Sequence, residues 1–502
     1  MYSPFRMTRR SVALSGLGAT GAKINLCAGR LRRPAHKFIF QMGMRQCARS
    51  NRDFPPGWLL CIILVRRQST EGKRLMKVYL DTVGCRLNQS EIEAMARQFR
   101  AAGHTVVASP GEADLVVVNT CAVTQKAVAD SRKLIRRVAR AGAGAIAVTG
   151  CWVSLEPEGA ARLPNVRWVV PNLEKDRLVA TVLNLPQETF DLEPVERTPL
   201  PGLRLRTRAF IKVQDGCDLR CTFCITTIAR GPSRSRPIED VVRDVEAALR
   251  GGAQEIVLTG VHLGAWGKDF DPPMHLKDLV ATLLRRLPIP RLRLSSLEPW
   301  DLPEDFFELW EDPRLCRHLH LPLQSGSATV LKRMARRTTP EAYARLVETA
   351  RRAIPDVAIT TDIIVGFPGE TEAEFEESLA FVRAMDFAGG HVFTYSERPG
   401  TAAARMPHPV PHRLRKERNA RMRAVLEESA ARYRRRFLGR TLTVLWEAAS
   451  TLGPQGWTLT GLTDNYLRVQ ALAPENLWNR LTPVRLKTET EGGVLVGEMV
   501  SG

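Results

Sequence analysis

The chain has 502 residues, too many for one ordinary domain, and its length favours about three domains. Hydrophobic residues make up 44% and charged residues 25%, so a largely disordered chain is excluded because enough apolar side chains are present to form cores. The net charge is +20, and no apolar run approaches the roughly 20 residues of a membrane-spanning helix, so no membrane association is expected.

A basic extension opens the chain. Residues 1–75 hold 15 Lys and Arg against two acids and show no sustained period of 2 or 3.6. A secretory signal and an Arg-rich transit peptide are alternatives, but we expect a disordered extension or a start codon placed too early, with Met76 as the natural first residue. The remaining residues carry 58 basic and 51 acidic side chains, a mild excess that fits a polyanionic substrate.

Residues 76–190 alternate strand and helix patterns. Strands are expected at 77–82, 115–118 and 145–148, and a capping box of Ser90 and Glu93 is expected to start a helix that Gly103 ends. This alternation predicts an open parallel sheet covered on both faces. A cysteine follows each of the three strands, and ligands bind at that edge of such sheets, so the three thiols could meet in space: Cys85, Cys121 and Cys151.

The central region follows a linker with Pro194, Pro199 and Pro201. Six strand-like segments recur with helical stretches between them, and strands are expected at 209–213, 255–259, 291–295, 317–321, 357–361 and 391–395. Six such units predict a partial (β/α)6 barrel, in which the active site occupies the loops after the strands.

The last part of the chain changes period. A basic helix is expected from Arg413 to Arg440, followed by short strands at 441–447, 456–460, 466–469 and 484–488. Gly and Pro punctuate them, which predicts a small β-barrel. The fold class is therefore α/β with three domains, expected at 76–190, 203–435 and 437–502.

Three thiols lie on one short loop, at Cys217, Cys221 and Cys224. Close thiolates without a nearby His suit zinc or an iron–sulfur cluster. Their spacing of three and then two residues is unlike the repeated two-residue gaps of a zinc-finger pair. Three ligands would leave one iron of a four-iron cluster open for chemistry; a structural zinc site completed by a remote ligand is the alternative.

This spacing, with Phe223 before the last cysteine, resembles the signature of radical S-adenosylmethionine enzymes. The segments 84–88, 119–124 and 149–151 resemble the amino domain of the methylthiotransferases within that superfamily. The resemblance implies two [4Fe–4S] clusters, the catalytic one on Cys217, Cys221 and Cys224 and a second one on Cys85, Cys121 and Cys151. Phe223 is then expected near the adenine of the cofactor, with ordinary loop packing as its alternative role.

The loops after the barrel strands support the same resemblance. Their glycines let the backbone approach a ligand closely, and their polar side chains could bind the ribose and amino-acid parts of S-adenosylmethionine. Turn or cap roles are the alternative for each candidate. The candidate cofactor-binding residues are Gly260, Ser296, Glu298, Gln324 and Asp362. His262 is expected to be a loop hydrogen-bonding residue rather than a catalyst.

Segments 119–124, 207–216, 257–264 and 295–299 are most similar to the methylthiotransferases of threonylcarbamoyl-adenosine in tRNA. The expected function is therefore transfer of a methylthio group to C2 of N6-threonylcarbamoyladenosine at position 37 of tRNA. The same chemistry on isopentenyl-adenosine or on a ribosomal protein is the nearest alternative. A non-catalytic, zinc-bound RNA-binding protein is the alternative from another class.

The carboxyl-terminal part resembles a TRAM domain, a small RNA-binding β-barrel of this family. Basic side chains before it could neutralise tRNA phosphates, although a charge run is more often a solvated helix face: Arg434, Arg435, Arg436 and Arg440. Trp446 and Trp457 could stack on bases or pack in the core. The resemblance further implies a reducing cytoplasm and a flavodoxin-type or ferredoxin-type electron donor, and we expect a monomer.

Overall fold

Runs of apolar residues rich in valine form the first sheet of the computed structural model, which describes residues 75–186, 207–453 and 456–500. The extension 1–74 and the prolines Pro194, Pro199 and Pro201 lie outside the described residues. Five parallel strands take the order β2-β1-β3-β4-β5. They are β1 (Lys77–Thr82), β2 (Thr105–Val106), β3 (Leu115–Thr120), β4 (Ala145–Gly150) and β5 (Val166–Val170). The order reverses between β1 and β3, which creates a switch point where ligands bind in such sheets.

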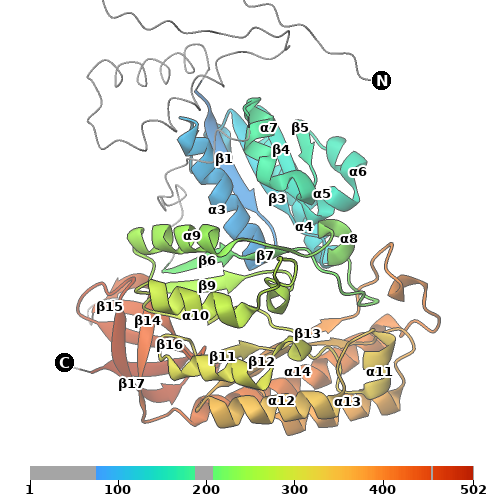
Figure 1. Ribbon diagram of the computed structural model, residues 1–502, viewed down its shortest axis with the longest axis vertical. Helices are drawn as coiled ribbons and strands as arrows, with labels where there is room; N and C mark the ends of the chain where they lie inside the picture. Colours follow the sequence, from blue (N-terminus) through green and yellow to red (C-terminus); the bar gives the residue numbers. More distant parts are fainter. Residues whose placement is uncertain (1–74, 187–206, 454–455, 501–502) are drawn as a thin grey trace, which may run out of the picture. The chain divides into compact units, whose positions relative to one another are not determined.

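Helices cover both faces of this sheet (Figure 1). They are α3 (Arg86–Ala101), α4 (Gln125–Arg140), α5 (Cys151–Leu155), α6 (Pro157–Ala161) and α7 (Leu178–Leu183). Alternation along β3 divides its side chains between two cores. Val117 packs in the core with Phe99 of α3, whereas Val118 packs with Ile135 of α4.

The predicted start of α3 is wrong. The helix begins at Arg86, and Cys85 stands at its N-cap without a side-chain cap. Ser90 lies inside the helix, and its hydroxyl accepts a hydrogen bond from the backbone N–H of Lys212 at 3.3 Å. The apolar stripe begins at buried Leu87, before the Ser-x-x-Glu pattern, so core burial decides the start of the helix. Strand β5 was not predicted.

Six parallel strands form the central region as two three-stranded sheets. One contains β6 (Arg208–Lys212), β9 (Glu255–Thr259) and β10 (Leu292–Leu294), and the other β11 (His318–His320), β12 (Ala358–Val365) and β13 (Gly389–Thr394). Parallel bridges between Leu292 and Leu315 and between Ser296 and His320 connect the two sheets. The strands therefore run in the order β6-β9-β10-β11-β12-β13, as an open partial barrel requires.

Helices and short elements fill the connections of this barrel. The helices are α8 (Thr226–Arg230), α9 (Ile238–Arg250), α10 (Leu276–Arg286), α11 (Ala328–Arg333), α12 (Pro340–Ala353) and α13 (Glu372–Met385). A small hairpin joins β7 (Gln214–Asp215) to β8 (Arg234–Ser235). Among the described residues, the 3-10 helices are Pro110–Glu112, Asn172–Arg177, Leu263–Ala265, Pro299–Asp301, Glu304–Glu311 and Ala403–Arg405.

A closed five-stranded barrel follows helix α14 (His412–Arg435), in the order β14-β15-β16-β18-β17. Its strands are β14 (Thr441–Gly453), β15 (Gly456–Thr463), β16 (Arg468–Ala473), β17 (Leu481–Glu489) and β18 (Leu495–Met499). Sequence analysis missed β18, and it placed the end of the helix beyond Arg435. Trp446 is fully buried in the barrel core, so of its two expected roles the structure shows core packing rather than stacking on bases.

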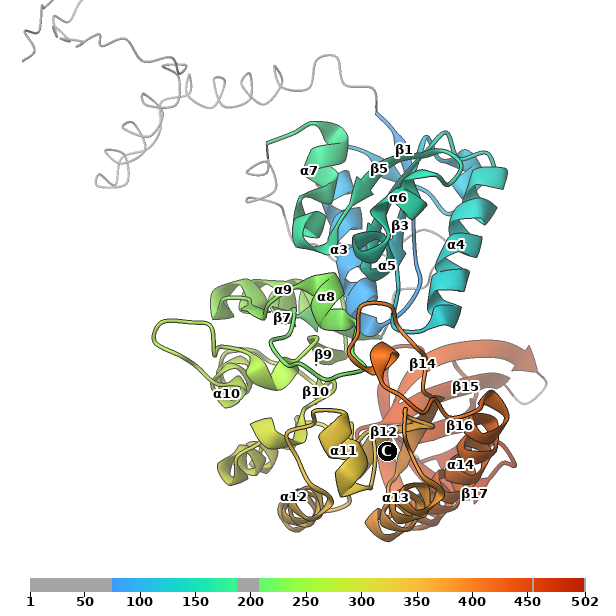
Figure 2. The ribbon, with the colours of Figure 1, turned by 90° about the vertical axis from the view of Figure 1, so that its right-hand side faces the viewer.

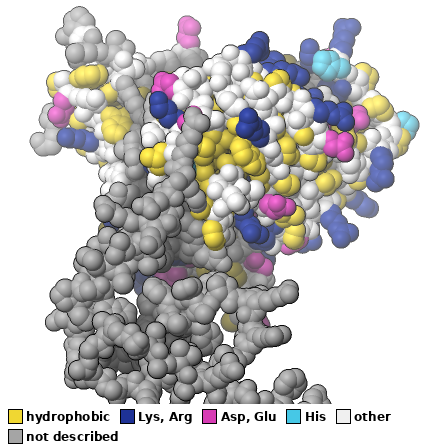
Figure 3. Space-filling view, turned by 90° about the horizontal axis from the view of Figure 1, so that it is seen from above, with side chains coloured by type: hydrophobic (Ala, Val, Ile, Leu, Met, Phe, Trp, Pro, Cys, Tyr) yellow, Lys and Arg dark blue, Asp and Glu magenta, His cyan; other side chains and the backbone are white. Residues whose placement is uncertain are grey.

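The α/β class, the parallel amino-terminal sheet, the partial six-stranded barrel and the small carboxyl-terminal barrel are confirmed. Leu75–Gly502 form one compact unit, seen from a second side in Figure 2. The domain boundaries at 76–190, 203–435 and 437–502 stay predictions. No helix in the described part of the chain is long and apolar enough to cross a membrane. On the face in Figure 3, Lys and Arg side chains are spread among acidic and apolar ones.

Candidate active site

The register of the first sheet brings three cysteines to one edge. Thr82 of β1 pairs with Asn119 of β3, and Asn119 pairs with Thr149 of β4, so the three strands end side by side. The cysteines follow directly: Cys85 before α3, Cys121 after β3, and Cys151 at the start of α5. The sequence prediction that these remote residues converge is consistent with this register.

A glycine permits close approach between two of these segments. Gly84 has φ +119°, and a Cβ added to it would lie 2.7 Å from Cys121 Cβ and 2.9 Å from its Sγ. Cys121 and Cys151 are buried, and Cys85 is exposed. Burial raises the pKa of the Cys121 thiol to about 11. Such a thiol stays protonated at neutral pH until a metal binds the thiolate.

The second set of thiols lies on the loop after β6 and β7. Gly216, with φ +71°, leads into Cys217, whose N–H donates to Gly231 O at 3.0 Å. The N–H of Cys224 donates to Cys221 O, also at 3.0 Å, which folds the loop back on itself. Burial raises the pKa of Cys217 to about 12 and also raises that of Cys221. Cys217 and Cys221 are therefore neutral thiols that would exchange their protons for a metal cluster.

Charged groups flank this loop. Arg336 Nη1 lies 3.8 Å from Cys221 Sγ, and its Nη2 donates to Glu298 Oε2 at 2.6 Å. On the other side, His262 Nδ1 lies 3.8 Å from Cys217 Sγ, and its Nε2 lies 2.5 Å from Asp301 Oδ2. Burial alone would raise the pKa of Asp301, but His262 and Lys268 hold it below its ordinary value.

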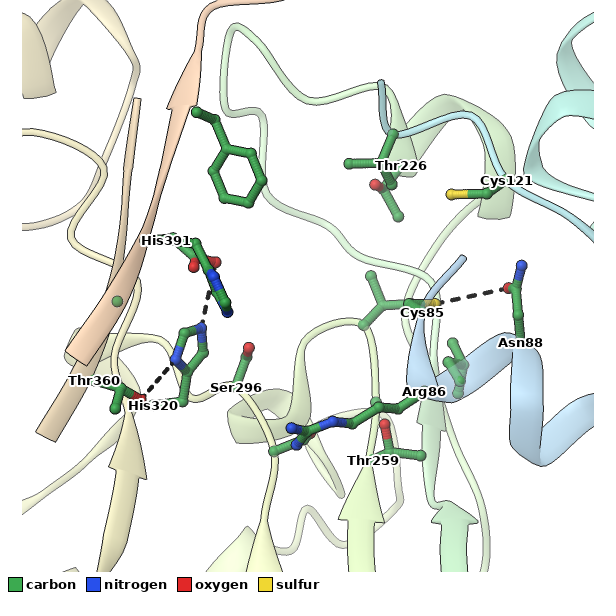
Figure 4. Close-up of a pocket in the computed structure, with 18 of the residues that line it drawn as sticks. Cys85, Arg86, Asn88, Cys121, Thr226, Thr259, Ser296, His320, Thr360 and His391 are labelled. Carbon is green, nitrogen blue, oxygen red and sulfur yellow. Dashed lines mark hydrogen bonds and ion pairs between the residues drawn. The ribbon is translucent and has the colours of Figure 1, made fainter. Parts of the chain in front are cut away.

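A cavity of about 520 Å³ lies between the amino-terminal sheet and the barrel strands. All three amino-terminal cysteines line it, together with residues of β9, β11, β12 and β13. In Figure 4, Cys85 and Cys121 lie on one side of the cavity and His320 and His391 on the other. The cavity is of the size that holds a nucleoside-sized ligand.

The structure brings together three of the predicted cofactor-binding residues. Gly260, Ser296 and Asp362 line the cavity. Asp362 Oδ2 lies 3.3 Å from His320 Nε2, while its Oδ1 is buried without a partner among the described residues. An orphaned buried acceptor of this kind suits a polar ligand.

The other three predicted residues lie outside the cavity lining. Glu298 is bound to Arg336, and Gln324 has φ +77° and donates its N–H to Asp362 O at 2.8 Å. Phe223 packs beside Phe367 and Tyr395 in a small apolar cluster. Their contact with a cofactor stays a prediction.

A buried network of charges joins the two cysteine-bearing regions. Arg230 Nη1 lies 3.0 Å from Glu91 Oε1 and 2.8 Å from Asp215 Oδ1. Lys175 Nζ lies 2.7 Å from Glu91 Oε2. Burial alone would raise the pKa of Glu91, but Lys175 and Arg230 hold it well below its ordinary range. The network keeps α3 and the loop before Cys217 in fixed relation.

The predicted RNA-binding arginines are largely paired with carboxylates. Arg434 lies 2.6 Å from both Glu427 and Glu489. Arg440 and Arg436 lie 2.6 Å and 3.5 Å from Asp356. Arg435 is exposed and takes part in no ion pair with the described residues. Most of this basic run therefore attaches α14 and the following turn to their neighbours.

Sequence analysis missed several residues of the site. Arg230 and Asp215 carry opposite charges on either side of the cysteine loop, and that pattern could have indicated an ion pair. Arg336, His318 and Tyr466 reach the site from remote segments and carry no local signal.

The donor sets fit iron–sulfur clusters. Each set offers three cysteine thiols, and within 75–186, 207–453 and 456–500 no three Cys, His, Asp or Glu side chains are grouped closely enough for a single metal ion. A four-iron cluster holds its thiolates further apart than a single ion does, and Cys is its usual ligand.

Comparison with known proteins supports this chemistry. Residues 211–382 match the radical SAM superfamily, and residues 77–170 match the family described as "Uncharacterized protein family UPF0004". The structure is similar to the radical S-adenosylmethionine methyltransferase TsrM from Kitasatospora setae (TM-score 0.52, 18% identity, 65% of this chain and 75% of that chain). At this identity the likeness concerns the fold alone.

Three relatives cover most of the chain. The threonylcarbamoyladenosine tRNA methylthiotransferase MtaB of Thermotoga maritima is 38% identical over 85% of this chain and 98% of its own length. Its Bacillus subtilis counterpart is 35% identical over 82% of this chain and 93% of its own length. A tRNA-2-methylthio-N(6)-dimethylallyladenosine synthase of Bacillus subtilis is 33% identical over 84% of this chain and 86% of its own length.

The partial barrel with three thiols after its first strand defines a radical SAM enzyme, which by its superfamily uses a [4Fe–4S] cluster and S-adenosylmethionine. Because its residues 77–170 also match a second family and the chain is 33–38% identical to the relatives above over most of their length, it belongs to the radical SAM tRNA methylthiotransferase family.

Proposed function

We propose that the protein transfers a methylthio group to C2 of N6-threonylcarbamoyladenosine at position 37 of tRNA. The observation that carries the proposal is the shared cavity, which three remote cysteines line from one side and Gly260, Ser296 and Asp362 from the other. The two relatives of 35% and 38% identity, named for this substrate, support the choice of nucleoside.

The two cysteine sets take separate roles in this proposal. The catalytic [4Fe–4S] cluster, which binds S-adenosylmethionine, would be held by Cys217, Cys221 and Cys224. When bound there, S-adenosylmethionine would supply the deoxyadenosyl radical that attacks the inert C2–H bond. Cys85, Cys121 and Cys151 would hold the second [4Fe–4S] cluster, on the side of the cavity from which sulfur must reach C2.

The remaining site residues orient and enclose the reactants. Gly260, Ser296, Glu298, Gln324 and Asp362 would hold S-adenosylmethionine, with Phe223 near its adenine. Gly260 allows the backbone close approach, since a Cβ there would lie 2.9 Å from Gln214 Oε1.

The wider partners follow from the same chemistry. The substrate is tRNA, and the carboxyl-terminal barrel with Arg434, Arg435, Arg436 and Arg440 would contact its phosphates. Arg435 is the one of these arginines without a carboxylate partner among the described residues, so it would contribute most. We propose a flavodoxin-type or ferredoxin-type electron donor, a reducing cytoplasm and a monomeric enzyme.

The test is anaerobic purification with iron and sulfide analysis, followed by reaction with S-adenosylmethionine, dithionite and tRNA carrying threonylcarbamoyladenosine. We expect about eight irons per chain for two four-iron clusters and a methylthio-nucleoside detected by mass spectrometry. A product formed only on isopentenyl-adenosine, or only on a ribosomal protein, would overturn the assignment of the substrate. Zinc in place of iron would overturn the radical chemistry.

A further inference from the structure

Arg86 lies on an aromatic shelf at the base of the cavity. We define this shelf as Phe210 of β6, Tyr466 of the loop after β15, and His318 of β11. The Arg86 guanidinium lies 5.9 Å from the ring centroids of both Phe210 and Tyr466, and Nη2 donates to Tyr466 Oη at 2.5 Å. His318 stacks on Tyr466 with centroids 4.1 Å apart and the planes 7° from parallel. The shelf fixes the guanidinium of a side chain that lines the cavity.

The other arginines around this shelf and cavity have carboxylate partners. Arg293 pairs with Glu255 at 2.7 Å and 3.0 Å, and Arg208 pairs with Glu447 at 2.6 Å. Arg230, the other arginine of the cavity lining, is held by Glu91 and Asp215. The charges of Arg293, Arg208 and Arg230 are therefore neutralised by carboxylates of the protein itself.

Arg86 differs from them. It forms no ion pair with any carboxylate in the described part of the chain, and its side chain has one hydrogen-bond partner there, the neutral hydroxyl of Tyr466. Asp362 is the one acid among the described residues that line the cavity, and it lies beside His320. A half-buried cation without an anion is costly to keep, and a guanidinium fork matches a carboxylate with two parallel hydrogen bonds.

Direction also favours a ligand. Arg86 follows Cys85 directly, yet in Figure 4 its side chain extends away from the Cys85 thiol and toward the side of the cavity where Ser296 lies. The guanidinium therefore faces the space that a nucleoside would fill, and it does not point at the Cys85 thiol.

We propose that Arg86 binds the carboxylate of the threonylcarbamoyl group and so selects this nucleoside. The inference rests on the proposed function and names the residue that reads its substrate. An isopentenyl group has no anion, so its entry would leave Arg86 desolvated and unpaired. A binding site that forms a charged hydrogen bond to its ligand rejects analogues without that ligand group, because the charged side chain is then left buried and unpaired. Tyr466 and Phe210 act as positioning residues, since they hold the guanidinium in place.

The experiment compares two anticodon stem–loops with anaerobic, cluster-loaded enzyme. One carries threonylcarbamoyladenosine and the other carries its methyl ester, in which the carboxylate is neutral. Dissociation constants are measured by fluorescence anisotropy, and kcat/KM by nucleoside mass spectrometry. The variants are Arg86→Gln and Arg86→Lys. The matched control is Arg352→Gln, an exposed arginine of α12 paired with Glu348.

We expect esterification to weaken binding to the wild type roughly 10- to 100-fold, as for loss of a charge-assisted hydrogen bond. Arg86→Gln should weaken binding of the acid by the same factor and leave the ester unaffected, Arg86→Lys should be intermediate, and Arg352→Gln should match the wild type. Equal binding of acid and ester to the wild type would overturn the proposal without using any variant.

Two further outcomes would also overturn it. If Arg86→Gln weakens acid and ester alike, the side chain contacts a phosphate or serves the fold. If it raises only the KM for S-adenosylmethionine, the carboxylate belongs to the cofactor. Neither of these two outcomes contradicts the proposed function as long as the wild-type enzyme forms the methylthio product. If the wild type forms that product on neither the acid nor the ester RNA, the proposed function itself fails.

Discussion

Arg230 Nη2 donates a hydrogen bond of 2.8 Å to Asn88 Oδ1, and the same oxygen lies 3.7 Å from the thiol of Cys85. Arg230 closes the short helix after the Cys217–Cys224 loop, whereas Asn88 lies in the first turn of α3. One buried guanidinium therefore touches both cysteine-bearing segments. This contact, together with the packing of α5 on α8 and of α3 on β6, helps to fix the distance between the two proposed clusters.

Replacement of Arg230 with Met should destabilise the protein strongly. It leaves Glu91 and Asp215 buried with one cation fewer, and removal of one partner from a buried ionic group costs about 3 kcal/mol or more. The measurement is urea unfolding followed by circular dichroism. Arg286→Ala, in an exposed pair with Glu239, serves as the control and should leave stability nearly unchanged, because solvent screens such a pair. If Arg230→Met is as stable as the wild type, the charge network makes no net contribution to the free energy of unfolding.

The fold was largely predictable because strand and helix periods are local properties. The strand at 77–82 was predicted with the observed bounds, and those at 115–118 and 145–148 were two residues short. Errors arose where tertiary contacts decide. Helix α3 starts at Arg86 because its buried face begins there, and β18 pairs with β16 and β17, which no local pattern encodes.

Site residues that belong to a sequence motif could be predicted. Site residues that come together only when the chain folds could not. The three cysteines after successive strands could be grouped, because parallel strands end at one edge of their sheet. Arg336 and Tyr466 could not, because each approaches the cysteines from a segment more than 100 residues away.

Single cysteine substitutions should remove one cluster at a time. Cys217→Ser and Cys121→Ser should each reduce iron from about eight to about four per chain, since each cluster needs three thiolates. Cys217→Ser should also abolish cleavage of S-adenosylmethionine while tRNA binding stays within about twofold. Cys316→Ser is the control, because Cys316 is buried near Glu255 and away from both sets. Full activity in Cys217→Ser would refute the assignment of the catalytic cluster.

Gly84→Ala should disturb the second cluster selectively. The added Cβ would lie 2.7 Å from Cys121 Cβ, and Gly84 has φ +119°, so strain and contact combine. Gly142→Ala offers a matched control, because Gly142 has φ +97° with no atom within 4 Å of an added Cβ. We expect iron near four per chain in Gly84→Ala and near eight in Gly142→Ala. Iron near eight in both variants would show that neither the backbone conformation of Gly84 nor its close approach to Cys121 is needed for the second cluster.

Stability should fall with pH below about 6.5 because of His318. Burial first, and then Arg293, His320, Arg86 and Arg208, hold the pKa of His318 well below its ordinary 6.5. The folded protein therefore keeps the ring neutral, while the unfolded chain binds a proton as the pH falls below 6.5. Stability contributed by this residue is complete above that pH, and it is lost at up to about 1.4 kcal/mol per pH unit below it.

His318→Phe tests this linkage, because phenylalanine can keep the stack on Tyr466 without a titrating group. The free energy of unfolding is measured between pH 5 and 8 for both proteins, with His412→Phe, at the exposed start of α14, as the control. The curves of the wild type and His318→Phe should run parallel above pH 7 and converge or cross below 6.5, since only the wild type loses stability through this ring. Parallel curves over the whole range would show that His318 titrates alike in the folded and unfolded protein, and the cationic surroundings of the shelf would then have no effect on it.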